Sequence, residues 1–287
     1  MTAKLLDGKI LAQKIKDSLK SEVKALQQKT GSVPHLVNLI IGNDAGACAY
    51  ANSQKKTAEY IGINYKLETL PSNITEKDLI AHIERLNRDD SVNGIMIHKP
   101  VPSHINYRSV ANHVDIRKDL EGINVANIGK MIVEDTKIIP CTPAAVMEHL
   151  KATGVSLRGK EAVIVGHSEI VGKPLSLLLL AEYLTVTVCH VATSEAGHLQ
   201  EHVGRADILI VAVGKAHLIK GEWIRKGAIV IDVGINRIKD HIVGDVEFDT
   251  AKDKASFITP VPGGVGPVTV VMLMRNGVEA FKLQLAK

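Results

Sequence analysis

The chain has 287 residues, of which 45% are hydrophobic and 23% charged, and its formal net charge is +4. These values are typical of a globular protein with one large or two smaller domains. Aromatic residues make up only 3% of the chain, and no run of five basic residues occurs. We therefore expect neither a nucleic-acid nor a membrane partner, while an anionic small substrate remains compatible.

The cysteines do not form a recognisable pattern. Cys48, Cys141 and Cys189 are far apart and odd in number, which argues against a disulfide framework or a structural zinc site. His198 and His202 are four residues apart, but no third ligand accompanies them, so we expect no metal site. The first residues lack the apolar core of a signal peptide. We expect a cytoplasmic protein with reduced thiols.

The first half of the chain alternates helical and strand patterns. Apolar spacing predicts helices over 7–28 and 47–61 and a further helix that begins after Thr75 and ends at Asn87. Strands are predicted over 36–41, 65–70 and 93–99. Such alternation is typical of a parallel sheet with helices on both faces.

A second α/β series follows the segment Pro140-Cys141-Thr142-Pro143. A helix is predicted over 144–152, and strands over 162–165, 185–189, 208–213 and 228–233. Residues 268–284 are predicted to form a closing helix. The chain is therefore predicted to be an α/β protein with two lobes.

The segment Val163–Pro174 has the pattern strand, tight turn, helix start. A helix N-terminus presents unpaired N–H groups and a partial positive charge, so this turn suits a phosphate. The pattern Gly-x-Ser-x-x-x-Gly differs from the usual dinucleotide fingerprint, and an ordinary strand-to-helix turn is the alternative. The segments Asp207–Gly214 and Asp232–Asn236 also end strands at glycines, which favours a bound nucleotide.

The choice between NAD and NADP is not decided by these residues. The position where a carboxylate usually binds the ribose hydroxyls lies in Cys189–Thr193. That segment holds neither an acidic residue for NAD nor a basic residue for a 2′-phosphate.

Three motifs together resemble the methylenetetrahydrofolate dehydrogenase/cyclohydrolase family: residues 140–143, 166–174 and 260–267. The resemblance runs from Asp7 to the final helix. It implies an N-terminal α/β catalytic domain that binds folate, formed by residues 1–142 plus 267–287, and a Rossmann-type domain over 143–266 that binds NADP or NAD. It also implies a homodimer whose substrates are tetrahydrofolate species of one-carbon metabolism.

The family's reactions oxidise methylenetetrahydrofolate by hydride transfer and hydrolyse the methenyl product to formyltetrahydrofolate. The resemblance implies catalytic roles at Tyr50, Gln54, His98 and Glu121. It implies substrate contacts at Tyr50, His98, Pro100, Glu121, Pro262, Gly263 and Gly264. It implies cofactor contacts at Gly166, His167, Ser168, Ile170, Val171, Gly172, Val191, Gly214 and Ile235.

Several of these positions depart from the family pattern. The family carries lysine at position 54, glutamine at position 98 and aspartate at position 121, where this chain has Gln54, His98 and Glu121. Gln54 donates hydrogen bonds but neither transfers a proton at neutral pH nor carries charge. Lys55 and Lys56 point away from its helix face.

His98 is able to act as a general acid or base, although a hydrogen-bonded histidine at a strand end is the alternative. We predict that dehydrogenase chemistry survives and that cyclohydrolase activity is weak, lost or re-routed through His98. Lys99 is expected to face the opposite side of the strand.

The carboxylate of Glu121 is suited to the two parallel N–H groups of an amino-pyrimidine edge, although a surface glutamate is the alternative.

The family often has Arg at the position of His167, and Ser-Arg or Ser-Lys at the positions of Val191 and Ala192. The loss of these residues favours NAD over NADP. Two other functions remain open. One is a paralogue acting on another pterin-like or imine substrate, and the other is a non-catalytic folate- or nucleotide-binding protein.

Overall fold

The computed structural model describes residues 2–286 and divides them into two compact units. The first combines Gln13–Cys141 with the residues from Val270 onward, and the second combines the residues up to Ala12 with Thr142–Thr269. Helices α1 (Gly8–Thr30) and α11 (Val265–Leu285) contribute to both units. None of the helices within residues 2–286 is long and apolar enough to cross a membrane.

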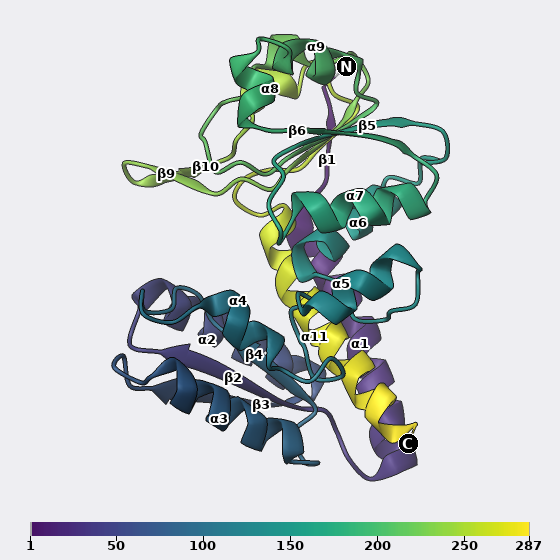
Figure 1. Cartoon of the computed structure of the whole chain (residues 1–287). Coiled ribbons are helices and arrows are strands. Elements are labelled where there is room, and N and C mark those ends of the chain that lie inside the picture. The colour runs from purple at the N-terminus through teal and green to yellow at the C-terminus, as the bar shows by residue number, and fades with distance from the viewer. Residues whose placement is uncertain (1, 287) are drawn as a thin grey trace. The chain divides into compact units, whose positions relative to one another are not determined.

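The first unit contains a three-stranded parallel sheet with the order β3-β2-β4 (Figure 1). Its elements in chain order are β2 (His35–Ile41), α2 (Ala45–Ile61), β3 (Asn64–Leu70), α3 (Glu76–Arg88), β4 (Gly94–Ile97), α4 (Tyr107–Asn112) and α5 (Val125–Ile132).

Alternation along β2 decides which helices cover each face of this sheet. Val37, Leu39 and Ile41 join one buried cluster with apolar residues of α3 and α4. Ile40 points the other way and packs with Ala47 and Ala51 of α2. Successive side chains of a strand point to opposite faces, so both faces of β2 are covered, as its continuous apolar sequence predicts.

The second unit contains a six-stranded, wholly parallel sheet with the order β1-β11-β8-β7-β5-β6. Its strands are β1 (Lys4–Leu5), β5 (Glu161–Val165), β6 (Thr185–Cys189), β7 (Ile208–Val211), β8 (Ile229–Asp232) and β11 (Phe257–Ile258). Its helices are α6 (Cys141–Ala152), α7 (Gly172–Ala181), α8 (Val191–Glu195), α9 (Leu199–Arg205), η1 (Gly221–Trp223) and α10 (Phe248–Ala251). A hairpin of β9 (Asn236–Ile238) and β10 (His241–Val243) completes the unit.

The strand order of the second unit has a switch point. The chain runs outward from β5 to β6 and then returns to β7 on the other side of β5. Ligands of such doubly wound sheets bind beyond the carboxyl ends of the strands at this point.

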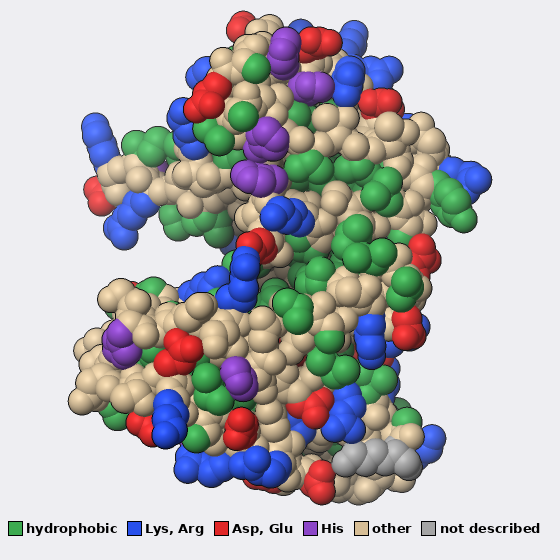
Figure 2. Space-filling view, in the orientation of Figure 1, with side chains coloured by type: hydrophobic (Ala, Val, Ile, Leu, Met, Phe, Trp, Pro, Cys, Tyr) green, Lys and Arg blue, Asp and Glu red, His purple; other side chains and the backbone are tan. Residues whose placement is uncertain are grey.

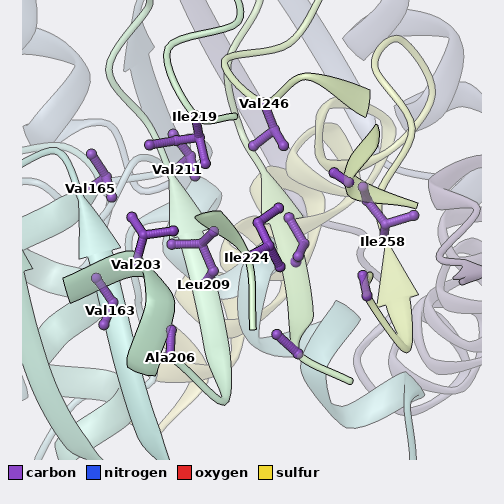
Figure 3. Packing of buried hydrophobic residues seen from close by; sticks show 14 of the residues in the cluster. Val163, Val165, Val203, Ala206, Leu209, Val211, Ile219, Ile224, Val246 and Ile258 are labelled. Atoms are coloured by element: carbon purple, nitrogen blue, oxygen red, sulfur yellow. The ribbon is translucent and has the colours of Figure 1, made fainter. Parts of the chain in front are cut away.

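Valines and isoleucines of the six-stranded sheet form the core of the second unit (Figure 3). Val163, Leu209 and Val230 come from neighbouring strands, and Val203 of α9 packs on the same face. Each is 1% exposed or less. The buried β-branched run that ends at Gly166 therefore anchors the turn that follows it.

The domain division expected from the sequence differs from these units at the N-terminus. The residues before Ala12 belong with the six-stranded sheet, because Lys4 and Leu5 pair with Phe257 and Ile258 of β11. A strand of two residues has no periodicity that a sequence pattern could reveal.

Candidate functional site

The predicted catalytic residues of the first unit lie on one helix and two loops near the carboxyl ends of its strands. Tyr50 and Gln54 are on α2, which follows β2, and His98 directly follows β4. Glu121 comes two residues after Asp119, which forms a parallel bridge with Ile95 of β4. Because parallel strands end at one edge of a sheet, the fold gathers side chains from three segments there.

Contacts of Tyr50 connect it first to His98 and Glu121. The rings of Tyr50 and His98 are edge to face, with centroids 6.0 Å apart. The pKa of Tyr50 is raised chiefly by burial, and the neighbouring Glu121 adds to the rise. The structure therefore brings Tyr50, His98 and Glu121 into one group.

Glu121 is a partly buried carboxyl group. Burial raises its pKa to about 7, and the nearby Asp119 adds to this, while a hydrogen bond from Tyr107 and the charge of Lys99 oppose it. The Tyr107 hydroxyl donates to Oε2 of Glu121 over 2.7 Å. The carboxyl is thus directed by a phenol and titrates near neutral pH.

The loop that carries Glu121 is organised by Asp119, which the sequence analysis did not identify. The Asp119 carboxylate is buried and accepts backbone N–H bonds from Glu121, Gly122 and Asn124 at 3.2, 3.0 and 2.9 Å. Asn276 of α11 holds the loop from behind, because its Nδ2 donates to the carbonyl of Leu120 over 2.8 Å. The spacing Asp-x-x-Gly was the available signal, since short acidic side chains often organise turns.

Gln54 lies deep in this group and is fully buried, with 0% exposure. Its Oε1 accepts a hydrogen bond of 2.9 Å from the Tyr65 hydroxyl, and its Nε2 lies 3.5 Å from the Met96 sulfur. A hydrogen bond from Gln54 also lowers the pKa of Tyr50 against the effect of burial. Gln54 therefore links two phenols and carries no charge.

His98 is 2% exposed, and burial lowers its pKa to about 4. Its backbone N–H is bonded to the carbonyl of Leu39, whereas its Nε2 is buried without a hydrogen-bond partner. A buried polar atom without a partner is costly, so it marks a position where a ligand atom would be favourable. The imidazole is neutral at pH 7.

Lys99 follows the strand alternation expected from the sequence, on the face opposite to that of His98, and its charge still reaches this group. Its Nζ is 3.9 Å from the centroid of the Tyr107 ring, and its charge acts on Glu121. Tyr107 packs with Ile97 on one face of the sheet, whereas His98 meets Tyr50 of α2 on the other, so the alternation of β4 continues through residue 99. Pro100 is exposed beside it.

The other predicted substrate residues, Pro262, Gly263 and Gly264, belong to the second unit. The backbone N–H of Gly8 is bonded to the carbonyl of Gly263 over 2.8 Å. A Cβ on Gly8 would lie 1.7 Å from the Gly264 oxygen. This loop is therefore packed on the first turn of α1, where only a glycine fits. Its role in binding substrate stays a prediction.

The turn from β5 to α7 has the features of a phosphate site. A Cβ on Gly172 would lie 1.9 Å from the carbonyl oxygen of Gly166, so the two ends of the turn touch through glycine backbone. The N-cap residue of α7, Val171, makes no side-chain cap bond, while its own N–H is bonded to the Ser168 hydroxyl. The Lys173 N–H is bonded to the Ser168 carbonyl and Pro174 has no N–H, so it is the positive end of the helix dipole and the close glycine backbone that suit the pyrophosphate of a dinucleotide.

Exposed apolar side chains follow four neighbouring strands of the six-stranded sheet. Ile170 follows β5, Val191 follows β6, Val213 follows β7 and Ile235 follows β8, with exposures of 39%, 68%, 36% and 68%. They all lie at the carboxyl edge, where the adenine and nicotinamide rings of a dinucleotide need apolar surfaces.

Two buried aspartates hold the loops on this edge, and neither was among the predicted site residues. Asp245 accepts backbone N–H bonds from Val213, Gly214 and Lys215 at 2.7–3.0 Å. Asp232 accepts those of Gly234, Asp245 and Val246 at 2.9–3.1 Å, and burial raises its pKa to about 6. The backbone N–H groups of residues 213–215 are bonded to Asp245 and not to a neighbouring strand, so β7 ends at Val211 rather than at residue 213.

Histidines gather on the surface of the second unit (Figure 2). The rings of His167 and His190, which follow β5 and β6, lie edge to face with centroids 5.2 Å apart. Within residues 2–286, no group of three or more His, Cys, Asp or Glu side chains is arranged to hold a metal ion.

The two units thus define a class: a dinucleotide-dependent α/β enzyme with a separate substrate-binding unit. The family model of the tetrahydrofolate dehydrogenase/cyclohydrolase catalytic domain matches residues 6–121, and that of its NAD(P)-binding domain matches residues 140–285. The chain belongs to the tetrahydrofolate dehydrogenase/cyclohydrolase family.

Relatives and solved structures agree over the full length. The chain is 49% identical to the bifunctional protein FolD of Acetivibrio thermocellus, over 99% of both chains. It is 41% identical to the FolD methylenetetrahydrofolate dehydrogenase/cyclohydrolase of Campylobacter jejuni, with a TM-score of 0.94 over 98% of this chain and 99% of the other. It is 36% identical to the Trypanosoma brucei FolD complexed with NADP cofactor and inhibitor, with a TM-score of 0.95 over both entire chains.

Proposed function

We propose that this chain is an NAD(P)-dependent methylenetetrahydrofolate dehydrogenase, which interconverts 5,10-methylenetetrahydrofolate and 5,10-methenyltetrahydrofolate. The observation that carries the proposal is the carboxyl group of Glu121, directed by Tyr107 and placed among Tyr50 and His98. A pterin edge presents parallel N–H donors, which a carboxylate accepts. The full-length family match does not favour the alternative of another substrate or of a non-catalytic binder.

The units divide the work of the reaction. The residues of the first unit bind and orient the folate: Glu121 accepts from the pterin edge, and Tyr50 and His98 flank it. In the second unit, the α7 N-terminus holds the pyrophosphate, and the exposed apolar residues at the strand ends line the ring sites. The bound nicotinamide supplies the hydride acceptor. Hydride transfer requires aligned carbons rather than a charged residue at position 54.

A direct assay tests this function. Methylenetetrahydrofolate is mixed with the protein and NAD or NADP, and the reduced nicotinamide and the methenyl product are followed by absorbance. With at least one cofactor, we expect the reduced nicotinamide to equal the sum of the methenyl product and the formyl product that hydrolysis forms from it. Failure to reduce either cofactor, in a protein that still binds the folate, would favour the non-catalytic alternative.

The absence of a basic residue at Val191 and Ala192 supports a preference for NAD. His167 and His190 are the nearby groups that a 2′-phosphate would meet. Comparing kcat/KM for the two cofactors decides the preference. A higher kcat/KM with NADP would contradict it.

A homodimer is supported by apolar side chains on the β9–β10 hairpin. Ile238 and Ile242 are 43% and 46% exposed on this two-stranded element, whose isolated form would be marginal in water. Light scattering at several concentrations should give a molar mass twice that of one chain. In Ile242→Glu, the molar mass should fall to that of a single chain. A cytoplasmic location stays a prediction, which the three free cysteines, Cys48, Cys141 and Cys189, support.

A further inference from the structure

The hydrolytic reaction needs a proton donor that neither Gln54 nor His98 provides. Water adds to the methenyl carbon and loses a proton, and the bond from that carbon to N5 then breaks as N5 takes up a proton. The second proton of the water leaves, so one proton is released overall. An amide does not donate a proton to N5 at neutral pH, and His98 is neutral there because burial lowers its pKa.

Lys99 brings a cation into this group from another element. Its Nζ lies 3.9 Å from the centre of the Tyr107 ring, whose hydroxyl is bonded to Glu121. Its charge lowers the pKa of Glu121, which shows that the ammonium is within electrostatic reach of the carboxyl. Since the Lys99 side chain is exposed, the ammonium is also open to a ligand.

The other lysines near this group are placed differently. Lys118 donates to the backbone carbonyls of Leu86, Asn87 and Asp89 at 3.0, 2.8 and 2.7 Å, so all of its N–H donors are used. Lys55 and Lys56 are exposed on α2, whereas Gln54 and Ala58 of the same helix are buried. The two lysines therefore point away from the helix face that carries Gln54.

We propose that Lys99 is the general acid of the cyclohydrolase step, donating a proton to N5 as the bond between N5 and the one-carbon unit breaks. The ammonium group is thus supplied by Lys99, in the loop after β4, and not by a residue of α2. The amine recovers its proton from solvent. This inference rests on the proposed function and assigns the hydrolytic reaction to a residue of the same site.

Removal of the amine tests the assignment with both reactions assayed separately. In Lys99→Ala, kcat of methenyl hydrolysis should fall about 100-fold, the scale of general acid catalysis, while kcat of hydride transfer falls far less. In Lys99→Arg, kcat of methenyl hydrolysis should fall by a similar factor, because a guanidinium keeps its proton at all working pH values. Lys56→Ala removes an exposed lysine of the first unit and should leave both rates unchanged. The urea midpoint of each variant verifies folding.

Two further measurements separate proton donation from a structural role. Ethylammonium in solution should restore hydrolysis by Lys99→Ala, whereas tetramethylammonium, which has no N–H, should not. The double variant Gln54→Lys with Lys99→Ala should also regain hydrolysis, because it returns an amine to the site from α2.

Each contrary result has a definite meaning. Full hydrolytic activity in Lys99→Ala or Lys99→Arg would overturn the assignment, as would an enzyme with dehydrogenase but no cyclohydrolase activity. A rise in folate KM for both reactions with unchanged kcat would make Lys99 a binding residue and overturn it as well. If neither reaction occurs in the unaltered protein, the proposed function itself fails and this inference with it.

Discussion

The hydroxyl of Tyr65 donates a 2.9 Å hydrogen bond to Oε1 of Gln54, inside a site where the family carries a lysine. Position 54 is fully buried, and its amide also acts on Tyr50. Gln54 is therefore a neutral link between two phenols. This arrangement explains how the position accepts the loss of charge without leaving a buried polar group unpaired.

The Gln54–Tyr65 bond should be measurable as a coupling energy. Gln54→Leu leaves the Tyr65 hydroxyl without its acceptor, so we expect a loss of about 1–3 kcal/mol in the free energy of unfolding. In the double variant with Tyr65→Phe, part of this loss should disappear, with a coupling of about 1 kcal/mol. Urea denaturation of the four proteins checks it. Additive losses would show that the bond contributes nothing.

Folate binding should weaken below neutral pH because of Glu121. Its carboxyl group has a pKa of about 7, and only the ionised form accepts both N–H donors of a pterin edge. The folate KM should therefore rise as pH falls from 8 to 6. In Glu121→Gln the KM should be higher and nearly constant over this range. A wild-type KM that does not change with pH would contradict the assignment.

His98 should lower stability in mild acid. Its pKa is about 4 in the fold and about 6.5 when unfolded, so between these values the unfolded chain binds more protons and stability falls as pH falls. His98→Gln removes this contribution. The free energy of unfolding of His98→Gln minus that of the wild type should therefore increase by about 1–3 kcal/mol from pH 7 to pH 4. The comparison must be made as a difference, since Asp232 and Glu121 titrate in the same range with the opposite sign.

The cofactor turn should not tolerate a side chain at Gly172. A Cβ there would lie 1.9 Å from the Gly166 oxygen, so Gly172→Ala must displace the backbone that holds the phosphate. We expect the KM for the nicotinamide cofactor to rise about tenfold or more, with little change for folate. Gly129 of α5 meets no atom within 4 Å, so Gly129→Ala is the matched control. It should stabilise the protein slightly. Equal cofactor KM values in the two variants would refute the role of the turn.

Cofactor preference should respond to position 191. Val191 is 68% exposed just after β6, where dinucleotide folds recognise the adenosine ribose. Val191→Arg should raise kcat/KM for NADP about tenfold through a charge-assisted bond to the 2′-phosphate, with a smaller effect on NAD. Steady-state kinetics with both cofactors measures the ratio. An unchanged ratio of kcat/KM for the two cofactors would show that the 2′-phosphate of NADP does not lie near residue 191.

Local patterns in the sequence determined much of this protein. The apolar strands and the turn at Gly166–Gly172 were predictable, because periodicity and glycine spacing are properties of neighbouring residues. The three motifs also led to the family, which the comparisons confirm. Tyr50, His98 and Glu121, which the family resemblance singled out, lie close together in the structure, while their catalytic roles stay a prediction.

The tertiary structure alone decided how the polar groups are partnered. Gln54 meets Tyr65, Asp119 gathers the loop of Glu121, and Asp245 gathers the loop of Gly214 through contacts between segments distant in sequence. Lys99 follows the alternation of β4, and it joins the site because the tertiary structure places Tyr107 and Glu121 beside it. Hydrogen bonds and burial depend on which segments the fold brings together, and these set the charge of the site.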